Sequence, residues 1–166
     1  MALPATSSKT SKIVLGIDPG FGRLGYALVS GTLTHPVLIE AGYIQTKGTN
    51  HGLRLSELRD KLTSVIARHQ PTSAAIERLF FSVNVKTALK VAEARGVVME
   101  LLTTHKLPVL ELSPQAVKMA ATGQGNADKK QVQKMLCLIF KLKQAPKPDD
   151  AADALAVALC GLSINN

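Results

Sequence analysis

The feature that most constrains the fold is the first apolar segment, because it ends on a carboxylate. Residues 13–17 are all apolar or glycine, which predicts a strand that is buried on both faces. Asp18 follows directly, and Pro19 and Gly20 then break the strand pattern. An unpaired buried carboxylate is costly. Asp18 therefore either begins an exposed turn, as residues before Pro-Gly often do, or is compensated by a cation.

The remaining segments predict an α/β chain with a mixed five-stranded sheet. Apolar runs bounded by turn residues predict five strands: 13–17, 24–30, 37–45, 73–77 and 108–113. Runs with helical period or helix-capping residues predict five helices: 51–69, 84–105, 114–121, 129–142 and 149–162. Ser113 and Asp128 are the expected N-caps of the third and fourth helices.

The order of these segments indicates how the sheet is built. Short connections make the first three strands an antiparallel meander, whereas the later strands alternate with helices and are expected to run parallel, with helices on both faces of the sheet. We expect a single domain over residues 12–166, preceded by a disordered leader over residues 1–11, which are rich in Ser and Thr.

Charge and composition favour a polyanionic partner. The net charge is +8, and residues 118–147 contain seven lysines and a single acid, Asp128. Such an excess is typical of proteins that bind nucleic acid or an anionic membrane surface, with a solvated helix face as the alternative. No apolar run approaches the length of a membrane span, and no signal peptide is visible. Cys137 and Cys160 are expected to be reduced core residues, so we expect a cytoplasmic protein.

Acidic residues are few, and several stand at the ends of predicted elements. Glu77 ends the fourth strand as Asp18 ends the first. If these strands are parallel neighbours, their carboxyl ends meet at one edge of the sheet and the two acids converge. Asp150 and Asp153 open the last helix at i, i+3 spacing, so they share one helix face. That helix is apolar on nearly every side and is therefore expected to be buried. Acidic residues at the start of a buried helix are more often functional than acidic residues at the start of a surface helix.

Four carboxylates at one point predict a metal centre, because they cannot all stay ionised without cations. An all-oxygen ligand set suits Mg²⁺ or Mn²⁺ rather than zinc. Two such ions together can promote in-line phosphodiester hydrolysis, and the lysines would attract the polyanion. Each acid also has a simpler explanation: Glu77 could be solvated or paired with Arg78, and acids at a helix start favour the helix dipole.

Three motifs taken together resemble a known family. "GIDPGFGRLGYA", "AIE" and "DDAADALAVA" resemble, in this order and spacing, the RuvC-type Holliday-junction resolvases of the ribonuclease H-like superfamily, over roughly residues 13–163. The resemblance implies a ribonuclease H-like fold and a homodimer that resolves four-way DNA junctions by paired symmetric nicks in recombination and repair. It also implies a branch-migration motor of the RuvA and RuvB type as partner.

The resemblance assigns roles to particular residues. It implies four catalytic metal ligands, with two metal ions between them: Asp18, Glu77, Asp150 and Asp153. Asp149 is an alternative to Asp150, since it stands at i, i+4 from Asp153. Among the residues expected to contact DNA, Phe80 is implied to act as a wedge at the junction, with Phe81 as its neighbour. Lys118 and Lys129 are implied to lie near the scissile phosphate, and Lys130 could assist them. The helix 84–105 corresponds to the dimer helix of the family, where Gly96 would permit close approach.

Three other functions fit parts of the sequence. The first motif is similar to the phosphate loop of actin-like ATPases, but that architecture needs two such domains and no second phosphate loop is visible. A non-catalytic DNA-binding protein would use the basic segment alone. A ribosomal-RNA-processing nuclease of the same superfamily would differ in substrate.

Overall fold

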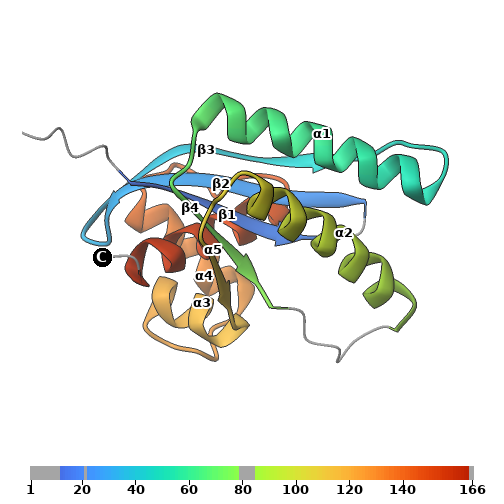
Figure 1. The fold of residues 1–166 in the computed structure, drawn as a ribbon. Helices are drawn as coiled ribbons and strands as arrows, with labels where there is room; N and C mark the ends of the chain where they lie inside the picture. Colours follow the sequence, from blue (N-terminus) through green and yellow to red (C-terminus); the bar gives the residue numbers. More distant parts are fainter. Residues whose placement is uncertain (1–11, 21, 79–84, 165–166) are drawn as a thin grey trace, which may run out of the picture.

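The computed structural model describes residues 12–20, 22–78 and 85–164, which form one mixed sheet with helices on both faces (Figure 1). Five strands lie side by side in the order β3-β2-β1-β4-β5. Their bounds are β1 (Ile13–Pro19), β2 (Arg23–Thr32), β3 (His35–Gln45), β4 (Ser73–Glu77) and β5 (Val109–Leu112). The β1–β2 and β2–β3 pairs are antiparallel, and the β1–β4 and β4–β5 pairs are parallel. The predicted mixed sheet is confirmed.

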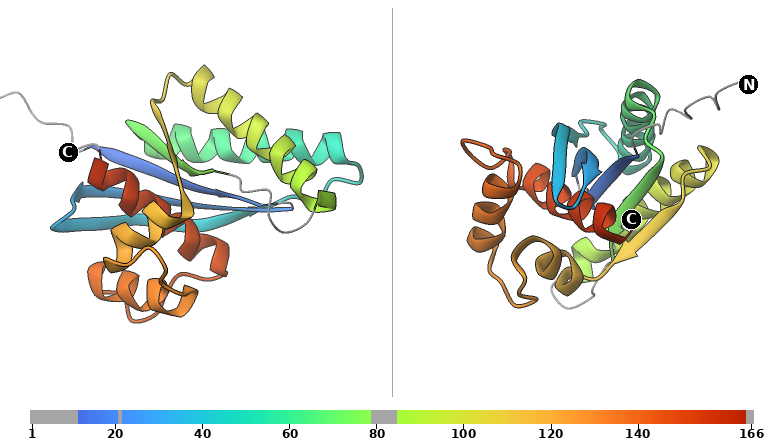
Figure 2. Two further views of the ribbon diagram at one scale, coloured as in Figure 1. Left: turned by 90° about the horizontal axis from the view of Figure 1, so that it is seen from below. Right: turned by 90° about the vertical axis from the view of Figure 1, so that its left-hand side faces the viewer.

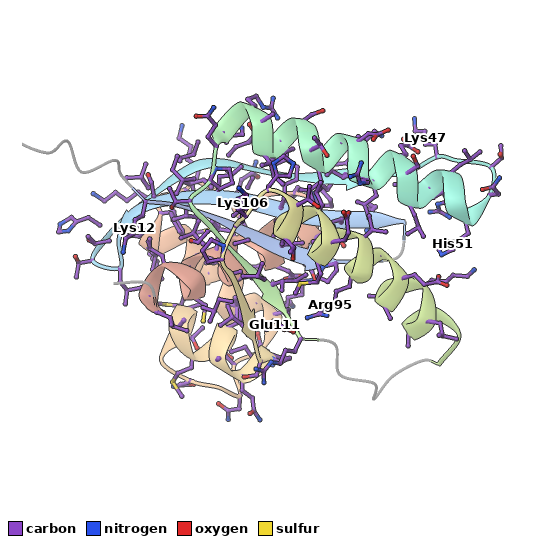
Figure 3. The ribbon with its side chains drawn as sticks, in the orientation of Figure 1. Lys12, Lys47, His51, Arg95, Lys106 and Glu111 are labelled. Atoms are coloured by element: carbon purple, nitrogen blue, oxygen red, sulfur yellow. The ribbon has the colours of Figure 1, made fainter. Side chains whose placement is uncertain are left out.

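The helices divide between the two faces of this sheet (Figure 2). Their bounds are α1 (His51–His69), α2 (Val85–Thr104), α3 (Pro114–Thr122), α4 (Lys129–Ile139) and α5 (Asp149–Ile164). Helices α1 and α2 cover one face, whereas α5 lies on the other face with α3 and α4 outside it. Among the described residues, no helix is both long and apolar enough to cross a bilayer.

Alternation along the strands produces two separate cores. On β1, Val14 belongs to the core beneath α5, whereas Leu15 and Ile17 belong to the core beneath α1 and α2. All three side chains are completely buried. This explains why the first strand is apolar at every position: a strand covered on both faces has no side that faces water.

Helix α5 packs unusually close to the sheet because small residues line the contact. A Cβ atom added at Gly16 of β1 would lie 2.4 Å from the Ala154 carbonyl oxygen and 2.4 Å from the Ala158 nitrogen. The helix is therefore held against the middle of β1 at backbone distance, and its first turn reaches the end of the strand that carries Asp18.

Predicted and observed boundaries differ by at most three residues, and two of the differences have a clear physical reason. Strand β1 continues through Asp18 to Pro19, because both residues still pair with β2. Helix α4 ends at Ile139 rather than at residue 142, because the chain leaves the helix at Phe140 and Lys141 takes a positive φ of 54°. The predicted caps are confirmed: the Ser113 side chain accepts from the Ala116 N–H, and Asp128 forms a capping box with Gln131.

A polar cluster fastens the end of α1 to the sheet and makes a testable contribution to stability. The Tyr26 hydroxyl donates to Glu40 Oε1 at 2.5 Å, Arg68 Nη2 lies 3.2 Å from the same oxygen, and His69 Nε2 lies 2.8 Å from Oε2. These contacts, that of Tyr26 first, hold the pKa of Glu40 below its ordinary 4.5. The stabilisation is therefore fully present above about pH 4.5 and is lost as the pH falls through the lower pKa of the folded state.

We expect Glu40→Gln to lower the free energy of unfolding by about 1–2 kcal/mol at pH 7, because the charge-assisted bonds are weakened. Urea denaturation at several pH values measures this, and the difference from the parent should shrink below pH 4. Glu100→Gln, which breaks the exposed pair with Arg59, is the control and should cost at most about 0.5 kcal/mol. Equal stability of Glu40→Gln and the parent at pH 7 would contradict this account.

Candidate active site

Two of the predicted acids lie on neighbouring parallel strands. Ile17 of β1 pairs in register with Ile76 of β4, so the next residues, Asp18 and Glu77, stand at the same carboxyl edge of the sheet. The prediction that these strands are parallel neighbours is confirmed. Both side chains are partly buried, which rules out the simple reading of Asp18 as the start of an exposed turn.

The first turn of α5 brings two more acids to this edge. A Cβ atom added at Gly25 of β2 would lie 1.9 Å from the Asp150 carbonyl oxygen, so the backbones of β2 and α5 nearly touch here. Gly25 is also the residue that pairs with Asp18. Ala151, Ala152 and Ala154 are buried around the acids, so the helix start is packed into the protein. We call Asp18, Glu77, Asp150 and Asp153 the acidic centre.

Electrostatics show that the four members of the acidic centre act on one another. The pKa of Asp18 is raised from 3.8 to about 7, first by burial and then by the charges of Asp153, Glu77 and Asp150, with Lys129 opposing. Burial and then the charge of Asp153 also raise the pKa of Glu77, opposed by Lys118. Mutual repulsion of this kind requires the carboxylates to be near one another, and it favours any cation that binds between them.

Basic side chains of the protein itself contact the three acids of α5. Arg23 Nη2 lies 3.1 Å from Asp150 Oδ2, and Lys129 Nζ lies 2.9 Å from Asp153 Oδ2. Lys129 Nζ also lies 3.2 Å from Asp149 Oδ2. Although burial of the Lys129 ammonium lowers its pKa, the contacts with Asp153 and Asp149 outweigh this and raise the pKa overall.

The surroundings of Asp149 and Asp150 differ, which bears on the choice between them. Asp149 is exposed, and its contacts with Lys129 and Gln133 hold its pKa below the ordinary range. Asp150 is less exposed and contributes to the raised pKa of Asp18, whereas Asp149 is not among the principal causes. The geometry favours Asp150 as the member of the acidic centre.

The donor set of the acidic centre fits a hard divalent cation. Every donor is a carboxylate oxygen, the ligand type that Mg²⁺ and Mn²⁺ prefer. Asp150 Oδ2 is buried and accepts no hydrogen bond, because the nearby Arg23 makes an ion pair without hydrogen-bond geometry. As the side chains stand, however, no three His, Cys, Asp or Glu residues in the described part of the chain are arranged to hold one ion. The four carboxylates thus have the chemistry expected of a metal centre, but their side chains are not oriented toward one common ion.

A cleft opens beside the acidic centre and combines acids with lysines. Its empty space is about 600 Å³, and its lining includes Glu77, Asp153, Lys118 and Lys129. Lys130, the next residue of α4, is exposed. The cleft therefore offers positive charge for a phosphate group directly beside carboxylates that attract cations. The predicted contact residues Phe80 and Phe81 lie outside the described residues.

Sequence reasoning did not identify Arg23 as part of this site. The sequence gives little indication that Arg23 lies near the acids, since it is an isolated basic residue after a Pro-Gly break. The hairpin register supplies the missing information: Leu24 pairs with Pro19, which brings the adjacent Arg23 to the edge that carries Asp18.

Removing the buried charge of Asp18 should stabilise the metal-free protein. Its folded pKa of about 7 lies above the ordinary 3.8, so the favourable protonated state is present at low pH and is lost as the pH rises through 7. At pH 8 in EDTA, Asp18→Asn should therefore unfold at a higher temperature, with a gain of up to about 4 kcal/mol. Added Mg²⁺ should raise the melting temperature of the parent more than that of the variant.

Asp60→Asn supplies the control for this measurement, because it removes an exposed carboxylate on α1 and should change stability by less than about 0.5 kcal/mol. A lower melting temperature for Asp18→Asn than for the parent in EDTA would show that the carboxylate makes net stabilising contacts.

Fold and site together define the class of this protein: a ribonuclease H-like α/β domain with an acidic centre at the carboxyl edge of its parallel strands. The model of the family described as crossover junction endodeoxyribonuclease RuvC matches residues 14–161, which is most of the chain. The chain belongs to the RuvC family.

Individual relatives agree with this assignment. The chain is 46% identical over 155 residues to the crossover junction endodeoxyribonuclease RuvC of Pseudothermotoga lettingae, covering 93% of this chain and 96% of that protein. The RuvC structure of Thermus thermophilus matches with a TM-score of 0.81 and 33% identity over 89% of this chain and 92% of that one. The T. thermophilus RuvC in complex with a Holliday junction substrate matches with a TM-score of 0.79 and 31% identity, over 90% and 91% of the two chains.

Proposed function

We propose that this chain is a crossover-junction endodeoxyribonuclease that resolves four-way DNA junctions by paired symmetric nicks, in homologous recombination and DNA repair. One observation carries the proposal: the acidic centre adjoins a cleft that is lined by Glu77, Asp153, Lys118 and Lys129. Membership of the RuvC family supports the choice of substrate, since the matched relatives are named for this activity.

The acidic centre would hold the divalent cations that the reaction uses. Asp18, Glu77, Asp150 and Asp153 are the proposed ligands. The raised pKa values of Asp18 and Glu77 support a cation here, and the all-oxygen chemistry of the four side chains supports Mg²⁺ or Mn²⁺. Two ions are proposed, and such ions supply Lewis acidity and an activated water for in-line phosphodiester hydrolysis. The carboxylates themselves would gather the cations, which would neutralise the repulsion between these side chains and the phosphate at the cleavage point.

Basic and aromatic residues would bind the DNA. Lys118 and Lys129 line the cleft and are proposed to contact phosphates at the cleavage point, with Lys130 beside them on α4. On DNA binding, Lys129 would exchange the carboxylates of Asp149 and Asp153 for a phosphate. Phe80 and Phe81 are proposed to stack on bases of the opened junction, an interaction worth about 1–3 kcal/mol per base.

We further propose a homodimer, because two symmetric nicks need two active sites related by a two-fold axis. Helix α2 is the proposed contact: Leu89 is 66% exposed on it, and a Cβ atom added at Gly96 would meet nothing within 4 Å. A branch-migration motor of the RuvA and RuvB type is the proposed partner, and the cytoplasm the proposed location.

Cleavage of a synthetic junction tests this proposal. The junction should be able to branch-migrate and should be incubated with the protein in Mg²⁺ or in EDTA, with nicks mapped on all four strands. We expect metal-dependent nicks at matching positions in one opposing pair of strands, and no cleavage of linear duplex. Cleavage of structured ribosomal RNA instead would support the processing nuclease, and binding without cleavage in Mg²⁺ or Mn²⁺ would support the non-catalytic alternative.

A further inference from the structure

Arg23 contacts the acidic centre as a displaceable counter-ion would, rather than through hydrogen bonds that stabilise the fold. It stands at the start of β2, where pairing with Gln45 of β3 fixes its backbone. Its guanidinium nitrogen Nη2 lies 3.1 Å from Asp150 Oδ2, but that oxygen accepts no hydrogen bond. The Arg23 side chain is 50% exposed, whereas that of Asp150 is 23% exposed. The contact is therefore mainly electrostatic, and Arg23 can leave it toward solvent.

The same arrangement explains why the acidic centre is not oriented to hold an ion. The two α5 members of the acidic centre are engaged by cations of the protein, Asp150 by Arg23 and Asp153 by Lys129. In the described part of the chain, no three acids are arranged as ligands of one ion. A divalent cation that uses Asp150 Oδ2 must therefore displace or repel the guanidinium that is already there.

We propose that Arg23 is an internal competitor for the divalent cation at Asp150. It neutralises Asp150 in the metal-free protein and withdraws when the cation binds, so it weakens metal binding while protecting the empty centre from charge repulsion. This inference rests on the proposed function, because it takes Asp150 as a metal ligand.

Arg23 and Lys129 have different surroundings. Substitution of Arg23 therefore tests competition with a divalent cation without also changing a proposed phosphate contact. Lys129 lines the cleft beside Lys118 and contacts two acids, Asp149 and Asp153. Its charge therefore serves both the carboxylates and a bound phosphate. Arg23 is not among the residues that line this cleft, and the ion pair that the structure gives it is with Asp150. Removing the charge of Arg23 should thus change metal binding with little direct effect on the phosphate.

Calorimetric titration with Mn²⁺, in the absence of DNA, measures the inference directly. Four full-length proteins are compared: the parent, Arg23→Gln, Arg23→Lys and Arg59→Gln. Loss of this ion pair, in which the Arg23 side chain is half-exposed, should tighten Mn²⁺ binding by Arg23→Gln about five-fold. Arg23→Lys keeps the charge and should stay within about two-fold of the parent. Arg59→Gln removes an equally exposed arginine, 47% against 50%, from the pair with Glu100 and should bind like the parent.

Each outcome bears on the inference, and melting in EDTA checks that every variant is folded. Equal or weaker binding by Arg23→Gln overturns it, as does equal tightening by Arg59→Gln, which would mark an effect of net charge alone. If the parent binds Mn²⁺ and Arg23→Gln binds it no better, the inference fails while the proposed metal site stands. If neither protein binds Mn²⁺, both fail. If Arg23→Gln does not fold, Arg23→Lys decides the question. Because lysine keeps the positive charge, tighter Mn²⁺ binding by Arg23→Lys would contradict competition by charge.

Discussion

Glu77→Gln should abolish junction nicking while leaving junction binding intact. The loss should be at least ~10³-fold in the rate of cleavage, as for other groups that act directly in an active site. Glu77 lines the cleft together with Asp153 and stands beside Asp18 at the carboxyl edge of the parallel strands. Glutamine keeps its size but removes the negative charge that a divalent cation needs. The proposed phosphate contacts come from lysines, which the substitution leaves in place.

The measurement pairs single-turnover cleavage of a labelled junction in Mg²⁺ with a gel-shift titration in EDTA. Asp60→Asn is the control, because it removes an exposed carboxylate on α1 and should cleave at the parental rate. Since burial raises the pKa of Glu77, removal of this charge should not weaken the fold, and the melting temperature checks this. Parental cleavage by Glu77→Gln would remove Glu77 from the acidic centre. Loss of binding together with cleavage would assign it to DNA contact instead.

The positions of Asp18 and Glu77 could be predicted from the sequence because each follows from the element that carries it. An apolar run that ends on Asp18 must be a buried strand, and Glu77 ends a second such run. Parallel pairing of the two strands then brings both acids to one edge, as the structure has it. For Asp150 and Asp153 the sequence indicated only that they share one face of a buried helix. Their place at this edge depends on how the start of α5 packs against β2, which the structure supplies.

Contacts between side chains could not be predicted in this way. The pairing of Arg23 with Asp150 joins a hairpin to a helix more than 120 residues later in the chain, and no periodic pattern links them. Glu40 likewise gathers Tyr26 and His69 from β2 and the end of α1. Such contacts depend on how long side chains are oriented once the backbone is in place, whereas patterning reports only which faces are buried. This is why the position of the acidic centre could be predicted, whereas the contacts of Arg23 and Lys129 with its carboxylates could not.

Gly25→Ala should both destabilise the protein and impair cleavage, because this residue sets the distance between β2 and α5. The new Cβ would lie 1.9 Å from the Asp150 carbonyl oxygen and 2.5 Å from its carbonyl carbon, both backbone atoms that cannot rotate away. The strand or the helix must shift, at a cost of about 3 kcal/mol or more in the free energy of unfolding. The shift displaces Asp150 and Asp153 from Asp18. Misplacement by about 1 Å can cost ~10²-fold in rate.

Two measurements separate the effect on the site from the effect on the fold. Urea denaturation gives the loss of stability, and cleavage is then assayed at a temperature where the variant remains folded by circular dichroism. Gly52→Ala is the matched control: the atom nearest to its added Cβ is Asn50 Oδ1 at 3.6 Å, an ordinary contact in the first turn of α1. It should keep both stability and cleavage. Parental cleavage by folded Gly25→Ala would mean that the acidic centre tolerates movement of α5, and the close approach at Gly25 would then serve stability alone.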